Sequence, residues 1–600
     1  MKMLQFVVAI LFGATLAQAQ TFPPPPLHKF DDGPLTPVPC AVPVGSAPTG
    51  DQLEDQLETS FSLAKMLAAP IRKWAVRYNN APVNGDDVGY EIVADDSGYV
   101  YVAGYSYNQA GNPDCIVIKY NQNGRRLWNA RYNGPANLND VAYALAVDDS
   151  GNVYIAGYSV NSSPNRDFIT IKYNRKGIRQ WVASYNGPAN WHDGIYDLQL
   201  DKNGNAYVTG YSYAEASGYD WVTIKYNAAG VKQWLLRHNG PGNAEDCPYE
   251  MVLDDAANLY IAGYCSTKTS GYDFMTAKYN SAGVKQWTSR YNPPANKADI
   301  ANDIVLDNAG NVCVTGKSEN ASGDSDYLTL KYNNAGVLQW NQRYNGPGKG
   351  YDRGLDVTVD KQDNVYVTGR NWSNVSGDDW GTIKYNGAGV RQWIARYTGQ
   401  DLNPDIPYKV LVDAAGEVYV NGYSYRGQFR CMDYTTIGYS NAGVKQWTVY
   451  YDGPDHLSDI SYDMVLDTTG TIYITGESLG KTTGLDIATV KYVSPLSKAA
   501  DGAKNFSATA GPPMAFELAQ NFPNPFNPAT TISFTLPTAS HVRLAIYDLT
   551  GALVQILADG EMSAGQHHLN VDASRLASGV YFYRIEAGTY SATRKMILQK

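Results

Sequence analysis

The sequence predicts an all-β protein, in which an eight-bladed β-propeller is followed by a small Ig-like β-sandwich. Three observations predict this fold: a tryptophan that recurs every 53 or 54 residues, four strand patterns around each copy, and a change of pattern after residue 515. A chain of 600 residues is also too long for one ordinary core, so a repeat array or several domains are expected.

The recurring tryptophan marks an internal repeat, and a fixed period of this length is typical of solenoids and propellers. We expect these side chains to pack between neighbouring repeats. The series comprises Trp74, Trp128, Trp181, Trp234, Trp287, Trp340, Trp393 and Trp447.

One copy, residues 195–240, shows how each repeat divides into strands. Short alternating segments separated by Gly, Asn and Asp turns are typical of β-hairpins, and no helical periodicity interrupts them. Four strands per repeat fit a propeller blade. The expected strands are Ile195–Leu200, Ala206–Tyr213, Asp220–Asn227 and Val231–Asn239.

The two ends of the array predict ring closure. The eighth copy ends at Tyr492 without a tryptophan strand, whereas Lys73–Asn79, the first tryptophan strand, precedes the first complete copy. We expect Lys73–Asn79 to complete the eighth blade beside Ala488–Tyr492, because this would hide two sheet edges at once. The alternative is a seven-bladed ring with one stray repeat.

Stretches such as Asp140–Ser159 (DVAYALAVDDSGNVYIAGYS) resemble the bacterial β-propeller repeat called SBBP. The resemblance covers roughly residues 74–492, within a predicted propeller domain of residues 73–492. It implies the propeller fold, and it implies no common activity.

The N-terminal residues 1–19 have the pattern of a signal peptide. Lys2 precedes the apolar run Leu4–Leu16, and Ala17-Gln18-Ala19 forms an A-x-A cleavage site. No later run is long enough to span a membrane. Residues 20–72 are expected to form a Pro-rich segment and a short helix at 51–68, which would pack across the ring as a lid.

The C-terminal residues 516–600 follow a linker at 493–515 and have their own strand pattern. About seven short strands predict an Ig-like sandwich. The segment also resembles the type A sorting domain of type IX secretion, through Asn524–Pro528, Ile546–Asp548, Leu576–Tyr581 and the basic end Lys595–Lys600. The resemblance implies that the type IX machinery is a partner, and that the protein is released or attached to surface lipopolysaccharide.

Aromatic and charged residues that do not repeat are the candidates for ligand binding. An exposed aromatic side chain on a loop can stack on a sugar ring, although single surface aromatics are common. The candidates are Trp191 and His192 in one loop, Tyr351 and Arg353 near another, and Trp372.

An aspartate precedes the first strand of every repeat. Such a residue usually serves the blade, because Asp accepts backbone N–H bonds in turns. The alternative is a ring of carboxylates that binds Ca²⁺, a cation that prefers oxygen ligands. The set is Asp87, Asp140, Asp193, Asp246, Asp299, Asp352, Asp405 and Asp459.

The composition and the absence of known motifs argue against several classes of function. A net charge of −10 argues against nucleic acid as a partner. No C-x-x-C pair, G-x-S-x-G elbow or H-E-x-x-H motif occurs, so no cofactor is expected apart from the Ca²⁺ alternative. We expect a secreted or cell-surface protein that binds a glycan or a protein. The alternative is an extracellular propeller enzyme: a polysaccharide lyase, a glycosidase or a quinoprotein-like dehydrogenase.

A disulfide between Cys247 and Cys265 is expected within one hairpin. If the turn is centred near residues 256–257, position 247 faces 265 or 266. Facing Cα atoms lie about 4.5 Å apart in a non-hydrogen-bonded pair, which is within disulfide range.

Overall fold

The computed structural model describes residues 69–81, 83–163, 165–267, 271–348, 350–400, 403–426 and 431–493, and, beyond them, 517–518, 521, 526–536, 538–549, 551–563, 565–574, 576–588 and 590–599. Regular secondary structure in these residues is β-strand alone. The chain divides into two compact units, residues 1–500 and 501–600. The expected signal peptide, the helix at 51–68 and residues 494–515 of the linker lie outside the described residues.

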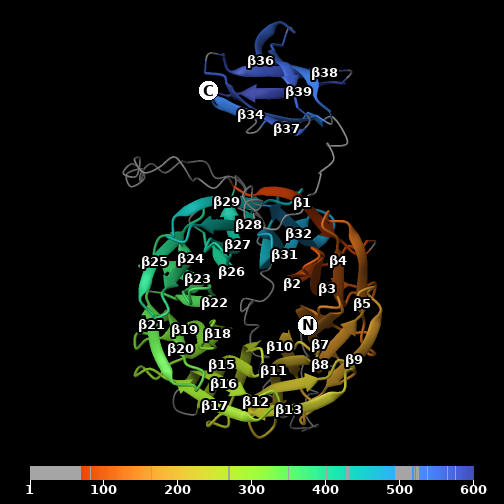
Figure 1. Cartoon of the computed structure of the whole chain (residues 1–600). Coiled ribbons are helices and arrows are strands. Elements are labelled where there is room, and N and C mark those ends of the chain that lie inside the picture. The colour runs from red at the N-terminus through yellow and green to blue at the C-terminus, as the bar shows by residue number, and fades with distance from the viewer. Residues whose placement is uncertain are drawn as a thin grey trace, which may run out of the picture. The chain divides into compact units, whose positions relative to one another are not determined.

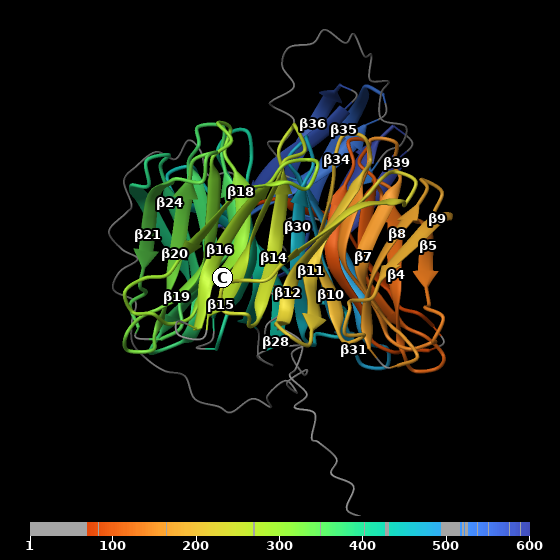
Figure 2. The ribbon, with the colours of Figure 1, turned by 90° about the horizontal axis from the view of Figure 1, so that it is seen from below.

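In its described residues, the first unit contains eight four-stranded antiparallel sheets that follow one another around a ring (Figure 1). Seven sheets consist of four consecutive strands, and the eighth has the order β1-β32-β31-β30. Repeated four-stranded sheets in this arrangement are consistent with a β-propeller. Seen from the side, the strands of each sheet run between the two faces of the ring (Figure 2).

In the seven sheets of consecutive strands the first strand lies nearest the centre of the ring, and in the eighth sheet the strand at the end opposite β1 takes this place (Figure 1). These inner strands are β2 (Asp87–Ala94), β6 (Asp140–Val147), β10 (Asp193–Leu200), β14 (Asp246–Leu253), β18 (Asp299–Leu306), β22 (Arg353–Val359), β26 (Ile406–Val412) and β30 (Asp459–Leu466). The second strands are β3 (Val100–Tyr107), β7 (Val153–Val160), β11 (Ala206–Ala214), β15 (Leu259–Thr267), β19 (Val312–Glu319), β23 (Val365–Ser373), β27 (Val418–Arg426) and β31 (Thr471–Gly480).

The third and fourth strands lie progressively farther out. The third strands are β4 (Pro113–Tyr120), β8 (Arg166–Tyr173), β12 (Gly218–Tyr226), β16 (Gly271–Tyr279), β20 (Ser325–Tyr332), β24 (Gly377–Tyr385), β28 (Cys431–Tyr439) and β32 (Gly484–Val493). The outer strands are β5 (Arg126–Tyr132), β9 (Arg179–Tyr185), β13 (Lys232–His238), β17 (Lys285–Tyr291), β21 (Leu338–Tyr344), β25 (Arg391–Tyr397), β29 (Lys445–Tyr451) and β1 (Ile71–Tyr78).

The predicted ring closure is confirmed. β1 pairs antiparallel with β32, and Trp74 lies opposite Lys491 while Tyr78 lies opposite Ile487. An ion pair of 2.5 Å between Arg77 and Asp486 joins the same two strands. β30 also adjoins β2, so the last sheet is a neighbour of the first.

The tryptophans pack between sheets, as the sequence predicts. Trp74 Nε1 donates a hydrogen bond of 2.9 Å to the Gln122 carbonyl in the outer turn of the next sheet. The Trp74 ring lies against Gly124 of that turn, where a Cβ atom would come within 2.8 Å of the indole. The same hydrogen bond to the next turn is formed by Trp128, Trp181, Trp234, Trp287, Trp340 and Trp393.

Each inner strand contains a β-bulge, and the extra residue at the bulge is usually tyrosine. In β2 the register shifts between Gly89 and Glu91, which leaves Tyr90 as the extra residue. A bulge turns a side chain out of the regular alternation. The Tyr90 ring contacts those of Tyr143 and Tyr462 at centroid distances of 5.2 and 5.6 Å, so aromatic side chains pack against one another between inner strands.

The expected disulfide between Cys247 and Cys265 is wrong, because of such a bulge. Leu253 lies opposite Leu259, and continuing this register would bring Cys247 opposite Cys265. The register shifts between Pro248 and Glu250, so Cys247 instead lies opposite Tyr264 and Asp246 opposite Cys265. Facing residues alternate between the two sides of a sheet, so the two thiols are on opposite sides and form no disulfide with each other.

The second unit contains two antiparallel sheets in its described residues, with orders β33-β34-β37 and β36-β35-β38-β39. Side chains such as Ile532, Phe534, Leu544 and Tyr583, from both sheets, share one buried core. The strands are β33 (Glu517–Leu518), β34 (Ala529–Leu536), β35 (Ser540–Tyr547), β36 (Leu553–Met562), β37 (Gly565–Asp572), β38 (Gly579–Ala587) and β39 (Tyr590–Leu598).

Candidate functional site

A cavity of about 220 Å³ lies where the sheet of β18–β21 meets the sheet of β22–β25. Lys317 and Ser325 come from the first of these sheets, and the remaining lining residues come from the second sheet and the loop before it. The lining consists of Lys317, Ser325, Tyr351, Asp352, Arg353, Arg370, Trp372 and Asp378.

The loop before β22 fits closely around Trp372. The Gly348 N–H donates a hydrogen bond of 3.2 Å to the Trp372 carbonyl. A Cβ atom at Gly348 would come within 2.8 Å of Trp372 Cδ1, and one at Gly350 would collide with the same ring. The two glycines therefore allow the loop to pass over the indole, which is itself half-buried. Beyond them, the side chain of Tyr351 is 67% exposed.

The buried side chain of Asp352 holds this loop in place through hydrogen bonds. Its carboxylate accepts hydrogen bonds from the N–H groups of Gly346 at 2.7 Å and Trp372 at 2.6 Å, and from Asn371 Nδ2 at 3.0 Å. Burial raises the pKa of Asp352, while these donors act in the opposite direction. The residue thus fixes the position of the aromatic side chain beside it.

Three cationic side chains reach the cavity from adjacent strands. Arg353 of β22 lies directly opposite Arg370 of β23, and Lys317 of β19 comes from the neighbouring sheet. Asp378 of β24 is 3.6 Å from Arg370. The cavity therefore combines aromatic surface with hydrogen-bond donors of positive charge.

The structure brings three of the five predicted ligand residues together: Tyr351, Arg353 and Trp372. Trp191 and His192 lie elsewhere, in the loop before β10. Their rings contact each other at a centroid distance of 5.1 Å, and His192 Nδ1 accepts a hydrogen bond from the Arg166 backbone. Burial, followed by the Arg166 charge, lowers the pKa of His192.

Lys317 and Arg370 were not among the residues predicted from the sequence, although their position in the repeat distinguishes them. Five other repeats have tyrosine at the corresponding position of the second strand: Tyr105, Tyr158, Tyr211, Tyr264 and Tyr423. Both cations replace that tyrosine, so a comparison of strand positions, and not only of loops, identifies them.

The eight aspartates of the candidate metal set are all buried, six of them as the first residue of an inner strand, and Asp352 and Asp405 directly before one. Asp140 illustrates their contacts, since its carboxylate accepts a hydrogen bond of 2.6 Å from the Gly134 N–H in the preceding loop. Burial raises the pKa to about 6 for Asp140 and about 7 for Asp299. These contacts agree with the role of tying each loop to its sheet.

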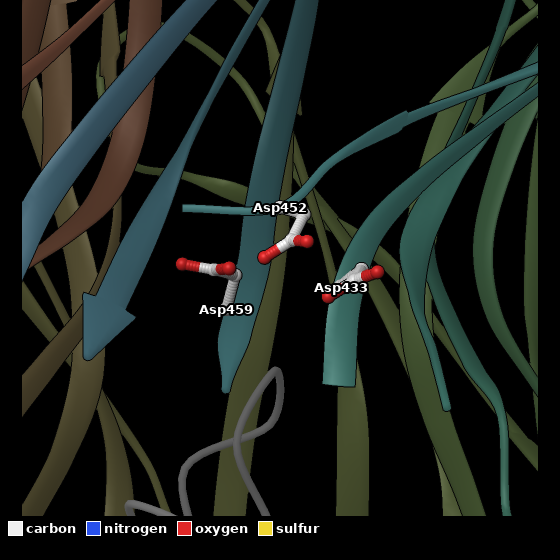
Figure 3. Close-up of side chains that lie close together, drawn as sticks. All are labelled: Asp433, Asp452 and Asp459. Carbon is white, nitrogen blue, oxygen red and sulfur yellow. The ribbon is translucent and has the colours of Figure 1, made fainter. Parts of the chain in front are cut away.

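Among the described residues, one group of acidic side chains could hold a metal ion: Asp433, Asp452 and Asp459 (Figure 3). One carboxylate oxygen from each lies within 4.8 Å of the others. Burial, together with the charges of Asp452 and Asp459, raises the pKa of Asp433 to about 8. Arg426 lies 3.6 Å from Asp433, so part of the negative charge is balanced within the protein.

This acidic group arises from two departures from the repeat. Tyr450 stands where six other repeats have an arginine, and Asp452 stands where six have an asparagine. In other sheets the arginine pairs with the third-strand aspartate, as Arg237 does with Asp220 at 2.7 Å. The sheet of β26–β29 therefore lacks the outer-strand arginine and gains one negative charge, while Arg426 of β27 lies near Asp433 instead.

Comparisons with known proteins concern both parts of the chain. A WD repeat-containing protein of Acanthamoeba polyphaga mimivirus is 23% identical over an alignment of 232 residues, and the match covers 31% of this chain and 16% of that relative. This chain thus spans about a sixth of the relative's length.

Solved structures similar to the chain have low identity. A Drosophila Plexin A complex with Semaphorin 1b has 9% identity and a TM-score of 0.34, covering 60% of this chain and 86% of that chain. A Synechocystis apocarotenoid oxygenase mutant has 7% identity and a TM-score of 0.35, covering 66% of this chain and 96% of that one. A putative gluconolactonase has 12% identity and a TM-score of 0.25, covering 47% and 87% respectively.

The C-terminal unit has the informative match. Residues 520–599 match the family model described as the secretion system C-terminal sorting domain. In the described part of the chain, no helix is long and apolar enough to cross a membrane. The family match identifies residues 520–599 as a secretion-system sorting domain, and such a domain indicates export to the cell surface or the medium.

Proposed function

We propose that this chain is an extracellular binding protein whose ligand site is the cavity at Tyr351, Arg353 and Trp372, and that its ligand is a saccharide. The observation that carries the proposal is the convergence of these three non-repeating residues on one cavity. Aromatic rings beside a few polar groups are typical of ligand sites. The sorting domain, which the resemblance ascribes to type IX secretion, supports a location where extracellular glycans are available.

Binding is favoured over catalysis by the partners of the two carboxylates in the cavity. Asp352 is held by three N–H donors, and Asp378 lies beside Arg370. Both carboxylates therefore have structural roles in the cavity, and we favour a binding protein over a lyase, a glycosidase or a quinoprotein-like dehydrogenase.

We also propose the finer description of the fold. The eight sheets of the first unit would be the blades of an SBBP-type propeller, and the second unit would be an Ig-like sandwich. The sheet orders and the pairing of β1 with β32 support the first part. The core shared by two antiparallel sheets supports the second.

The test compares Tyr351→Ala and Trp372→Ala with the full chain on a glycan array, followed by titration calorimetry on the saccharides that bind. Loss of one stacking side chain is expected to weaken binding about 10-fold or more, because such contacts are worth roughly 1–2 kcal/mol. Trp191→Ala is the matched control, since this tryptophan lies in another loop. Unchanged affinity in both cavity variants would refute the site.

A further inference from the structure

We propose that one face of the ring binds a membrane surface that contains anionic phospholipid. The binding surface is the outer rim, which comprises the turn between the third and outer strands of each sheet and the outer strand as far as its tryptophan. This inference goes beyond the proposed function and does not depend on it. The outer rim consists of residues 71–74, 121–128, 174–181, 227–234, 280–287, 333–340, 386–393 and 440–447.

The segments of the outer rim lie at the same end of every sheet. Each outer strand begins beside the end of a third strand: Lys232 lies opposite Tyr226, and Ile71 lies opposite Val493. The strands run between the two faces of the ring (Figure 2). The eight segments therefore form an annulus on one face, so a flat partner can contact several sheets at once.

The outer rim is cationic although the chain as a whole is acidic. Its segments contain eleven Lys and Arg residues and no Asp or Glu, whereas the net charge of the chain is −10. All eleven side chains are exposed. A local cationic surface attracts anions despite the overall charge. The cations are Arg72, Lys73, Arg125, Arg126, Arg175, Lys176, Arg179, Lys232, Lys285, Arg391 and Lys445.

The protein does not neutralise these cations. In the part of the chain that the structure describes, the carboxylates that form ion pairs have other partners, such as Lys331, which lies 2.7 Å from Asp307 in an inner turn of the same face. The guanidinium group of Arg126 lies 5.2 Å from the centre of the Tyr78 ring, a contact that leaves its charge in place. Exposed acidic residues of the inner turns, such as Asp96 and Asp149, are fewer than the rim cations.

The outer rim also exposes one or more aliphatic side chains in every sheet. The fold does not require them, because the turn forms equally with a charged residue: the carbonyl of Val231 accepts from the Asn227 N–H at 2.9 Å, and that of Arg125 accepts from the Asn121 N–H at 3.0 Å. These aliphatic side chains are between 38% and 58% exposed. They are Ile71, Leu127, Ile178, Val231, Val284, Val337, Leu338, Val390 and Val444.

The combination of the two residue types identifies the class of partner. Lys and Arg beside exposed apolar side chains are typical of surfaces that lie in the interface of an anionic membrane, where the cations meet lipid phosphates and the apolar groups leave water. A soluble polyanion would meet the cations and leave the aliphatic side chains in water. An anionic lipid surface satisfies both.

The path of the chain agrees with this orientation. β32 ends at Val493, which lies opposite Ile71 of the outer rim, so the chain leaves the first unit at the face that carries the rim. The cavity at Tyr351 and Trp372 lies among the loops at the other end of the strands. A ring bound through its outer rim would thus present this cavity away from the membrane.

The experiment measures cosedimentation of the full chain with lipid vesicles. One set contains phosphatidylcholine alone, and in the other about a third of the lipid is phosphatidylglycerol. We expect the anionic vesicles to bind at least about 10-fold more tightly. Binding should weaken as salt rises, because screening reduces charge interactions. Equal binding to both sets, or no binding to the anionic set, would overturn the proposal.

The double variant Arg175→Ala, Lys176→Ala tests the face. It restores Ala228 and Ala229 of the corresponding turn in another sheet, so it should fold. Each cation near an anionic surface contributes about 5-fold, so we expect the variant to bind anionic vesicles about 10-fold or more weakly.

The matched control removes the same charge from the opposite face. Lys297 and Lys481 are exposed in loops at the other end of the strands, and Lys297→Ala, Lys481→Ala should leave vesicle binding unchanged. If this control weakens binding as much as the rim variant does, overall charge decides binding and the assignment to the outer rim is wrong.

The aliphatic side chains distinguish a membrane from a soluble polyanion. Val231→Ser, Val284→Ser should weaken binding to anionic vesicles a few-fold and leave binding to heparin, measured in parallel, unchanged. Tighter binding to heparin than to vesicles would overturn the lipid assignment. Trp372→Ala, which tests the saccharide cavity, should not alter vesicle binding, so failure of either proposal is recognised separately.

Discussion

An aspartate at or just before the inner strand of each sheet is removed from water, and in most sheets it is hydrogen-bonded to the loop before it. Asp87, Asp193 and Asp246 repeat the contacts of Asp140, and burial raises their pKa to about 6, 6 and 7. The ordinary value for Asp is 3.8. Folding therefore favours the protonated form of these side chains. Between pH 3.8 and about 6 to 7, the folded protein binds more protons at these positions than the unfolded chain does.

This protonation predicts that the protein is more stable in mild acid. Because the folded-state pKa values are raised, their contribution to stability is fully present below pH 3.8 and is lost as the pH rises through about 6 to 7. The midpoint of thermal unfolding should thus rise by several degrees between pH 8 and pH 5. Calorimetry across this range checks it, and a maximum near pH 8 would contradict it.

Asp452 is expected to lower the stability of the protein slightly, because it adds a negative charge to an acidic group. Asp452→Asn restores the residue of six other repeats and removes a negative charge beside Asp433 and Asp459. We expect a gain of roughly 0.5 kcal/mol or less at pH 8, since Asp452 is partly exposed and its charge is screened.

The gain should shrink at pH 6, where the pKa values of about 8 and 7 leave Asp433 and Asp459 mostly protonated. Asp149→Asn, at an exposed site, is the control. Denaturant unfolding at both pH values measures the difference. A loss of stability at pH 8 would show that the repulsion is already compensated.

The strands themselves could be predicted well from the sequence, because alternation and turn residues recur in every copy. β11 was expected at Ala206–Tyr213 and is found at Ala206–Ala214. Register was harder to predict, because a bulge leaves no trace in the alternation of one copy. The Cys247 pairing was correct up to residue 250 and failed at the bulge around Tyr249.

Turn glycines differ in whether they contact the tryptophan of the preceding sheet, so we expect their substitution by alanine to reduce stability by different amounts. Gly389 has φ +81 and lies against Trp340, where a Cβ atom would come within 2.7 Å of Cδ2. Gly470 has φ +75 and nothing within 4 Å. An alanine at either position would have to adopt a left-handed conformation, which costs about 1 kcal/mol.

Gly389→Ala should therefore cost about 1–3 kcal/mol more than Gly470→Ala, because only the first forces the indole to move. Urea unfolding of the two variants isolates this packing contribution, since the backbone cost is common to both. Equal losses would show that the tryptophan contact contributes nothing to stability.

For the whole molecule, the number of repeats and the joining of the two ends could be predicted, because they depend on counting strands. The place of the cavity could not be predicted in full. Non-repeating residues indicate which positions are special, but Trp191 met the same criterion as Trp372 and lies at another junction. Which special residues meet depends on side chains from adjacent sheets, such as Lys317 and Arg353.

Ring closure predicts that residues 70–80 are required for a soluble ring. Deleting them removes β1 and leaves β32 as an exposed sheet edge beside an unfilled position in the last sheet. Such an edge can pair with other molecules. Size-exclusion chromatography should show aggregates and loss of soluble protein, and a stable monomer with unchanged unfolding would contradict the prediction.

The pairing of β1 with β32 also bears on how the ring folds. Arg77 Nη2 donates to the Ser478 carbonyl across 401 residues of sequence. β1 and β32 lie at opposite ends of the series of strands in the first unit, whereas the other seven sheets consist of strands that follow one another in the chain. Contacts of such long range form slowly, since a large loop must close first. We therefore expect the seven sheets of consecutive strands to form before the sheet that joins β1 to β32.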